Sequence, residues 1–202
     1  MPRTFLFDLG NVLFHFCHDR MCRQLGDLGG WPGDRMRSWL FASGMQCDIE
    51  RGRMSDDEFH RRFQSATGRT VALVDLQHAA SDIFWLNEPI LPVLDALQAK
   101  GHRLVLLSNI CESHFAFVRR RWDVLERFDE LVLSCRVGAV KPEPGIFEAA
   151  LNAIDCRPGE CFYTDDIAEY VETGRRHGLD AEVFTDVPAL LGHLERRSID
   201  LW

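Results

Sequence analysis

The chain has 202 residues, of which 46% are apolar, and its formal net charge is −8. This length fits one domain, or one domain that carries an insert, and the apolar fraction excludes a disordered chain. The acidic balance argues against a nucleic-acid partner. No apolar run approaches the roughly 20 residues of a membrane-spanning helix, and the N-terminal residues do not resemble a signal peptide. We therefore expect a soluble, cytoplasmic protein with no membrane partner.

Five apolar runs have the length of β-strands. They span residues 4–7, 103–107, 131–134, 161–164 and 181–184. The runs are almost continuously apolar, which is typical of strands buried on both faces. Segments with helical period separate or follow them, at residues 89–100, 145–154 and 188–196. Strands that alternate with helices predict an α/β fold with a doubly wound, Rossmann-like parallel sheet.

Residues 16–87 have a different pattern and contain no convincing strand. Helices are predicted at residues 34–45, 55–63 and 71–85. The second of these has strong start signals, because Ser55 is a good N-cap and Glu58 stands three residues later. We therefore predict a core domain of residues 1–15 and 88–202, with a small helical domain of residues 16–87 inserted after the first strand.

Seven cysteines are present, an odd number, and no two of them form a Cys-x-x-Cys pair. Cys17/Cys22 and Cys156/Cys161 share one spacing and could be read as a split metal site, but that spacing is less typical of zinc pairs than Cys-x-x-Cys. We therefore expect free, mostly buried thiols in a reducing compartment.

Polar side chains stand at the carboxyl ends of the first four predicted strands, or in the loops that follow them. They are Asp8, Ser108, Asn109, Lys141, Asp165 and Asp166, in chain order. Because the carboxyl ends of parallel strands meet at one edge of a sheet, we expect these side chains to share one crevice. Carboxylates that lie together repel one another unless a cation lies between them, and Mg²⁺ prefers oxygen ligands. The pattern therefore indicates a site for a hard divalent cation.

Four segments carry a resemblance to a known family. They are FDLGNVL at residues 7–13, LLSN at 106–109, GAVKPEPGIF at 138–147 and FYTDD at 162–166. Together they resemble the motifs of the haloacid dehalogenase-like (HAD) superfamily, and the resemblance covers nearly the whole chain. The helical insert looks like that family's small cap, and IERGRMSDDEF at residues 49–59 is similar to a segment common in it. Within the superfamily, the sequence most resembles the small sugar-phosphate phosphatases that begin FDLGNV.

The resemblance implies a Mg²⁺-dependent phosphomonoester hydrolase that acts on a small phosphorylated metabolite. Asp8 would be the nucleophile and would form an aspartyl-phosphate, which water then hydrolyses. The implied metal ligands are the Asp8 carboxylate, the carbonyl of Gly10, and Asp165. Asp166 would act through a metal-bound water or would orient Lys141.

The resemblance also implies a set of phosphate-binding residues. Ser108 and Lys141 would bind the phosphoryl oxygens and neutralise their charge in the transition state. Asn109 would line the same pocket, with its backbone N–H as a donor. The helical cap would close over the site, exclude water and select the leaving group.

One departure from the family's first motif bears on the mechanism. Gly10 stands where the family has a second Asp, the general acid for the leaving oxygen, and loss of such a group costs about 10²–10⁴ in rate. The substrate could have a leaving group that needs little protonation, such as the anomeric oxygen of a sugar 1-phosphate. His15 or His18 could act as a substitute acid and base. The protein could also be a weakly active or non-catalytic relative that binds phosphorylated metabolites.

A second class in the superfamily, the 2-haloacid dehalogenases, also lacks the second Asp. These enzymes need no metal and usually have Ser or Asn at the position of Asp165, so the Asp165-Asp166 pair favours a phosphatase. Tyr170 is a further departure, because the family often has Asn there. Candidate residues of the cap face, or else of the cap core, are Trp31, Trp39, Phe41 and Arg51.

Overall fold

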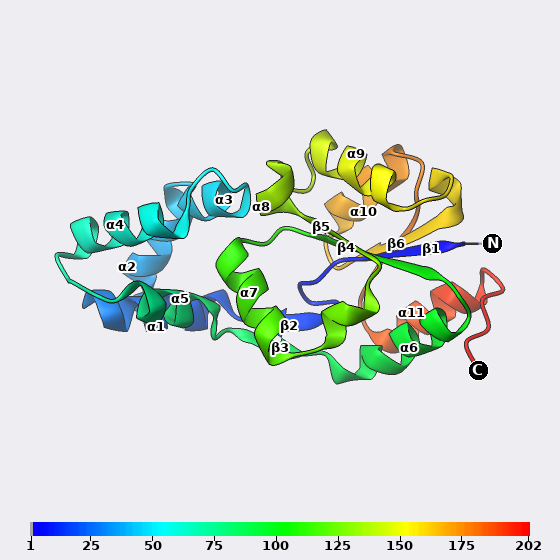
Figure 1. Ribbon diagram of the computed structural model, residues 1–202, viewed down its shortest axis with the longest axis horizontal. Coiled ribbons are helices and arrows are strands. Elements are labelled where there is room, and N and C mark those ends of the chain that lie inside the picture. The colour runs from blue at the N-terminus through cyan, green and yellow to red at the C-terminus, as the bar shows by residue number, and fades with distance from the viewer. Residues whose placement is uncertain (1) are drawn as a thin grey trace.

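A computed structural model describes residues 2–202 and has a five-stranded parallel sheet at its centre (Figure 1). Across the sheet the strand order is β5–β4–β1–β6–β7. The strands are β1 (Thr4–Phe7), β4 (Arg103–Ser108), β5 (Glu130–Leu133), β6 (Cys161–Asp165) and β7 (Asp180–Val183). The predicted α/β fold is therefore confirmed, and β1 lies in the middle of the sheet, between β4 and β6.

Helices cover both faces of the sheet, as Figure 1 shows. One face carries α6 (Leu91–Ala99), α7 (Glu112–Arg121) and α11 (Val187–Glu195), and the other carries α9 (Pro144–Ala153) and α10 (Ala168–Arg176). Short connecting segments are η2 (Glu88–Ile90), η3 (Val124–Arg127), α8 (Ser134–Val137) and η4 (Pro158–Glu160). Phe5 and Phe7 pack on the side of α6 and α11, whereas Leu6 packs on the side of α9. All three side chains are fully buried, which is why residues 5–7 are apolar on both faces of the strand.

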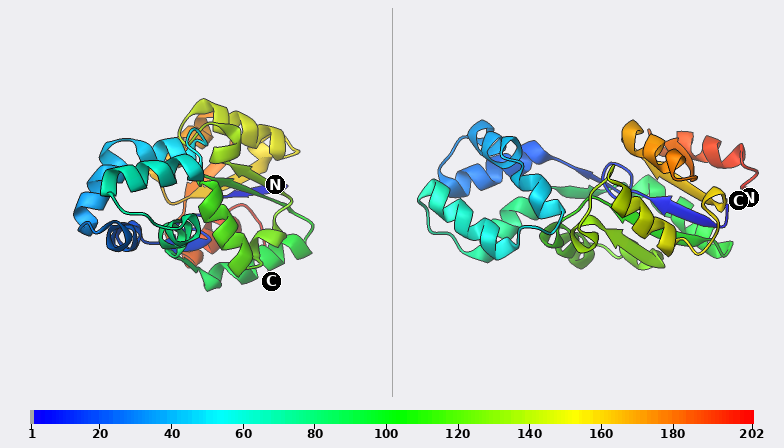
Figure 2. Two further views of the ribbon diagram at one scale, coloured as in Figure 1. Left: turned by 60° about the vertical axis from the view of Figure 1, so that its left-hand side comes forward. Right: turned by 90° about the horizontal axis from the view of Figure 1, so that it is seen from above.

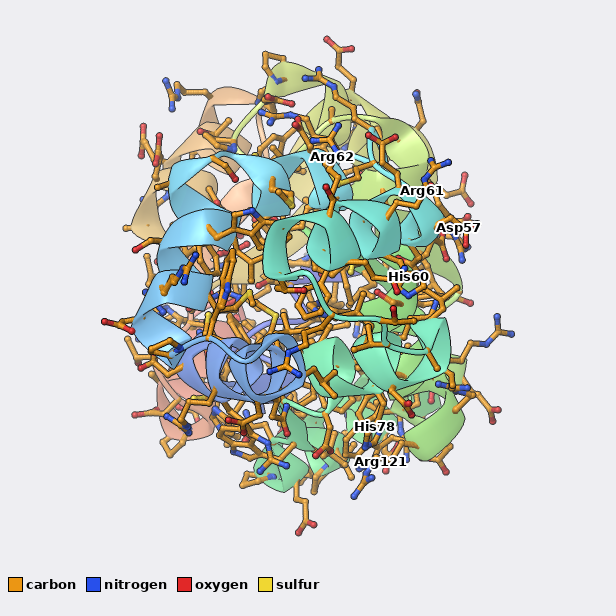
Figure 3. All side chains as sticks on the ribbon, turned by 90° about the vertical axis from the view of Figure 1, so that its left-hand side faces the viewer. Asp57, His60, Arg61, Arg62, His78 and Arg121 are labelled. Carbon is orange, nitrogen blue, oxygen red and sulfur yellow. The ribbon has the colours of Figure 1, made fainter. Side chains whose placement is uncertain are left out.

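Residues 18–81 form a group of helices at one end of the elongated molecule, which we call the helical unit (Figure 2, right). Its elements are α1 (His18–Gly29), α2 (Gly33–Arg37), the π-helical turn η1 (Ser38–Ala42), α3 (Met45–Glu50), α4 (Asp56–Thr67) and α5 (Leu73–Ser81). The unit has a hydrophobic core of its own, in which Met36 and Phe63 are fully buried. Charged side chains such as Arg61 and Arg62 lie on its outer surface (Figure 3).

Two short strands were not predicted. β2 (Phe14–Phe16) and β3 (Phe84–Leu86) pair antiparallel where the chain enters and leaves the helical unit. The predictions that residues 16–87 lack a strand, and that a helix reaches residue 85, were therefore wrong. A three-residue strand is too short for a periodic signal, and each of these strands forms only because its partner, distant along the chain, lies beside it.

The helices of this unit follow the sequence signals in part. The Ser55 hydroxyl accepts a hydrogen bond from the backbone N–H of Glu58 at 3.2 Å, so the predicted N-cap of α4 is confirmed. The helix predicted at residues 34–45 is divided instead. Gly44, at φ +74°, separates η1 from α3, because an α-helix does not continue through a residue with left-handed backbone geometry.

The helical unit contacts the sheet region through the end of α3. The Ser134 hydroxyl donates a hydrogen bond to the backbone carbonyl of Glu50 at 2.7 Å. Gly52 follows at φ +69°, and a Cβ atom there would lie 2.1 Å from the carbonyl oxygen of Cys135. Position 52 therefore needs glycine both for its backbone conformation and for the close approach of the two chain segments.

We expect Gly52→Ala to destabilise the protein more than Gly44→Ala does. Both positions have positive φ, at +69° and +74°, so each alanine costs about 1–2 kcal/mol of backbone strain. The space around Gly44 is open, whereas the methyl group added at position 52 meets the Cys135 carbonyl, which costs about 1–3 kcal/mol more. Urea unfolding of both variants measures the difference. Equal losses of unfolding free energy would contradict a tight contact at Gly52.

Candidate active site

Three acidic side chains and a lysine meet at the carboxyl edge of the sheet. Lys141 Nζ donates to Asp8 Oδ1 at 2.7 Å, to Asp165 Oδ2 at 2.6 Å and to the carbonyl oxygen of Leu107 at 3.0 Å. One oxygen each of Asp8, Asp165 and Asp166 lies within 4.8 Å of the others. Because β1 and β6 are neighbours in the sheet, Asp8 lies beside the acidic pair, although the two are far apart in the sequence.

Burial strongly affects the charges of this cluster. It raises the pKa of Asp8 to about 7, which the Lys141 ammonium opposes and the Asp165 carboxylate favours. Burial lowers the pKa of Lys141, but Asp165 and Asp8 together outweigh it and raise that pKa above its usual range. Burial also raises the pKa of Asp166, against a hydrogen bond from Asn11. One ammonium therefore faces three carboxyl groups, and this set of oxygen donors fits a hard divalent cation such as Mg²⁺.

The loop after β1 shows what the Gly-Asn pair of the first motif does. Asn11 has φ +54°, in the left-handed region that asparagine tolerates, and its Nδ2 donates to Asp166 Oδ2 at 2.9 Å. A Cβ atom at Gly10 would lie 2.8 Å from a ring carbon of Phe16. The Phe16 ring therefore occupies the space in which a side chain at position 10 would begin. The second acid of the family motif would enter this loop only if the ring moved.

The Asn109 side chain holds the lysine loop in place. Its Oδ1 accepts from the backbone N–H of Lys141 at 2.7 Å, and its Nδ2 donates to the Lys141 carbonyl at 3.1 Å. Ser108 precedes it at the end of β4, and both residues line the cavity described next. The side-chain amide of Asn109 thus positions Lys141, a role that the sequence did not predict.

A cavity of about 210 Å³ lies between the sheet edge and the helical unit. The lining residues that bear on its chemistry are Asp8, Phe16, His18, Glu50, Lys141 and Tyr170. Lys141 Nζ lies 5.3 Å from the centre of the Tyr170 ring, so this aromatic side chain forms part of the wall next to the acidic cluster. The volume suits one small molecule rather than a polymer.

The two histidines proposed as substitute acids lie in different places. His15 is on the exposed side of β2 and packs beside Trp85 of β3, outside the group of residues that line the cavity. His18, at the start of α1, does line it. Burial, together with the charges of His114 and Arg37, lowers the pKa of His18 to about 4. At neutral pH His18 is therefore uncharged and has little capacity to act as an acid.

Glu50 and His114 also line the cavity, and the sequence reasoning missed both. Glu50 is the last residue of α3 and belongs to the IERG segment, whose resemblance to the family carried no role for this side chain. His114 is buried in α7 and its ring nitrogen is 3.1 Å from the carbonyl oxygen of Ala80. The one signal available in the sequence was a glutamate that stands two residues before a glycine.

The other residues considered in the sequence analysis have structural roles. The aromatic residues considered for the cap face, Trp31, Trp39 and Phe41, pack against the core of the helical unit. Arg51 forms an ion pair with Glu143 in the loop after Lys141. All seven cysteines lie within residues 2–202 and are free thiols, but the prediction that most are buried was wrong, because only Cys22, Cys111 and Cys161 are buried. Among the helices of the same residues, none combines the length and the apolar character that crossing a membrane requires.

Asp8, Lys141 and the Asp165-Asp166 pair lie together at one edge of the sheet, as the resemblance of their motifs to the haloacid dehalogenase-like hydrolases implies. The family model described as haloacid dehalogenase-like hydrolase matches residues 2–178. The chain therefore belongs to this family, and the resemblance noted in its four motifs is confirmed.

Individual proteins resemble it along most of their length. A D-ribitol-5-phosphate phosphatase of Bacteroides thetaiotaomicron is 25% identical over 190 residues, which are 89% of this chain and 90% of that protein. The structure of a HAD-like family hydrolase from Porphyromonas gingivalis has a TM-score of 0.83 at 25% identity, and the match covers 96% of this chain and 98% of that one. A HAD family enzyme of Bacteroides thetaiotaomicron, in complex with magnesium and inorganic phosphate, has a TM-score of 0.82 at 22% identity, over 92% of this chain and 95% of that one.

Proposed function

We propose that this hydrolase is a Mg²⁺-dependent phosphomonoesterase that acts on a small phosphorylated metabolite through an aspartyl-phosphate on Asp8. The observation that carries the proposal is the buried Asp8 carboxylate, which lies 2.7 Å from the Lys141 ammonium and beside two further acids. The residues that would hold the ion are Asp8, Gly10 through its carbonyl, Asp165 and Asp166. The ion would supply the positive charge that lets an anionic phosphate approach an anionic nucleophile.

The proposed reaction has two steps. In the first, an oxygen of Asp8 bonds to phosphorus, and the bond from phosphorus to the leaving oxygen breaks. In the second, water bonds to phosphorus and the bond to Asp8 breaks, which releases inorganic phosphate. Ser108 and Lys141 would bind the phosphoryl oxygens in both steps, and Asn109 would keep Lys141 in position through its two backbone contacts.

Sugar or polyol phosphates are the substrate class that we propose. The cavity of about 210 Å³ suits a single small metabolite, and the similarity to a D-ribitol-5-phosphate phosphatase extends over 89% of the chain. Residues 16–87 would act as a cap domain on a core of residues 1–15 and 88–202, closing over the substrate, excluding bulk water and selecting the leaving group.

A panel of phosphate esters tests this function. D-ribitol 5-phosphate, glucose 1-phosphate, glycerol phosphate and p-nitrophenyl phosphate are incubated with the protein and Mg²⁺, and released phosphate is measured. We expect hydrolysis with Mg²⁺, loss of activity in EDTA and recovery when excess Mg²⁺ is restored. Activity that survives chelation would contradict the metal-dependent mechanism. Chloride release from 2-chloropropionate, without phosphatase activity, would favour a haloacid dehalogenase, and binding of a phosphate ester without turnover would favour a non-catalytic protein.

A further inference from the structure

An alkyl phosphate needs a proton at its leaving oxygen, and the usual donor is missing from this site. Gly10 has no side chain, and the Phe16 ring fills the space beside it. The Asp8 and Lys141 side chains are hydrogen-bonded to each other. Asp8 is the proposed nucleophile, so it does not also protonate the leaving oxygen. A proton donor must therefore come from another wall of the cavity if the proposed phosphatase acts on sugar or polyol phosphates.

Glu50 stands on that other wall. It comes from the helical unit, whereas Asp8 and Lys141 come from the sheet edge, and all three line the same cavity. One carboxylate oxygen of Glu50, Oε1, accepts a hydrogen bond from Gln46 Nε2 at 2.9 Å. The carboxyl group is therefore oriented by Gln46, a buried neighbour on the same helix, α3.

The end of α3 and the two residues that follow it, Arg51 and Gly52, are held against the sheet region by three contacts. The Ser134 hydroxyl donates to the Glu50 carbonyl at 2.7 Å. The next residue, Arg51, pairs with Glu143, and its Nε donates to Glu143 Oε1 at 3.1 Å. Gly52 then packs directly on the backbone of the chain segment that follows Ser134. These contacts hold the backbone at Glu50 in place beside the cavity that its side chain lines, and a proton donor requires such a fixed attachment.

We propose that Glu50 is the proton donor for the leaving oxygen, in place of the acid that position 10 lacks. This inference rests on the proposed phosphatase function. In the first step the Glu50 carboxyl group gives its proton to the leaving oxygen as the bond to phosphorus breaks, and a neutral alcohol departs. In the second step the resulting carboxylate takes a proton from the water that bonds to phosphorus. Glu50 then has its proton again, and phosphate is released.

The surroundings of Glu50 favour the protonated form that this role needs. Burial raises the pKa of Glu50 above its usual value, against the Gln46 hydrogen bond and the positive charges of His114, Arg51 and Lys141. The charge of Glu50 in turn raises the pKa of Tyr170 across the cavity, a minor effect beside burial. The other cavity group from the helical unit, His18, has its pKa lowered by burial and is uncharged at neutral pH.

Glu50→Gln tests the inference, because the amide keeps the size of the side chain and can still accept the Gln46 hydrogen bond. With glycerol phosphate or D-ribitol 5-phosphate, we expect kcat/KM to fall by about 10²–10⁴-fold. With p-nitrophenyl phosphate, whose leaving group departs without a proton, we expect a fall of less than about tenfold. The loss of activity on the basic side of the pH profile, which would report the loss of the Glu50 proton, should disappear in the variant with the alkyl substrates.

The matched control is Glu148→Gln, the same chemical change on the exposed surface of α9, which should leave both substrates unaffected. Thermal unfolding of both variants verifies that they fold. Full activity of Glu50→Gln on alkyl phosphates would overturn the inference, and so would equal losses on both kinds of substrate, because a proton donor acts selectively on the poor leaving group. If the unmodified protein hydrolyses neither substrate, the proposed phosphatase function fails instead.

Discussion

Asp8→Asn is expected to lower phosphatase activity by about 10⁴-fold or more, because the amide cannot form the bond to phosphorus. The substitution keeps the shape of the side chain, and its amide oxygen can still accept the hydrogen bond that Lys141 donates at 2.7 Å. The rate of phosphate release from p-nitrophenyl phosphate is a suitable measurement, since this substrate needs no proton donor. The loss should therefore be independent of Glu50.

A chemical trap separates the role of Asp8 as nucleophile from a role in binding. When a substrate with a labelled phosphoryl group is mixed with the enzyme and quenched in acid, the unmodified protein should retain label as an acyl phosphate, and Asp8→Asn should retain none. Substantial activity of the variant, above about one per cent, would contradict covalent catalysis through Asp8. Label on the variant would place the phosphoryl group on another residue.

Lys141→Met is expected to lower the free energy of unfolding by about 3–5 kcal/mol in the presence of a chelator, because it leaves buried carboxylates without their counter-charge. Lys141 is 2% exposed, and its ammonium serves two carboxylates, Asp8 and Asp165, and the carbonyl of Leu107. The compact ammonium with three donors suits three acceptors that surround one point. Urea unfolding in EDTA measures the loss.

The natural control for this variant is Lys100→Met, at the only other lysine of the chain. Lys100 is exposed after α6, so its replacement should change stability by less than about 0.5 kcal/mol. A similarly small effect of Lys141→Met would show that the carboxyl groups take up protons and no longer need the ammonium. In that case the stability of the protein would depend little on the ion pairs that Lys141 forms with Asp8 and Asp165.

The acidic cluster was predictable because its signals are local. Asp8 and Asp165 each come directly after an almost continuously apolar run, and such runs form parallel strands buried on both faces. The carboxyl ends of parallel strands lie at one edge, so side chains at those positions converge without any knowledge of the remaining packing. Ser108, the last residue of β4, follows by the same rule, whereas Lys141 lies beyond α8 in the loop after β5 and was placed only by its motif. The four motifs then indicated the family, and the match to residues 2–178 confirmed it.

The role of Asn109 could not be predicted from its position at a strand end. Its position after β4 placed it at the edge of the site, but its side chain is hydrogen-bonded to the backbone of Lys141, in a loop that follows a different strand. β2 and β3 are a similar case, because each three-residue strand depends on a partner at the other end of the helical unit. In both cases the deciding hydrogen bond joins segments that are distant in the sequence.

The sequence by itself determined the sheet, the edge at which the chemistry lies and the absence of an acid at position 10. Only the tertiary structure decided that the Phe16 ring fills the space beside Gly10 and that Glu50 reaches the cavity from the helical unit. The physical reason is the range of the interactions. Burial and strand direction act over a few neighbouring residues, whereas the place of an inserted side chain depends on how two separately packed units meet.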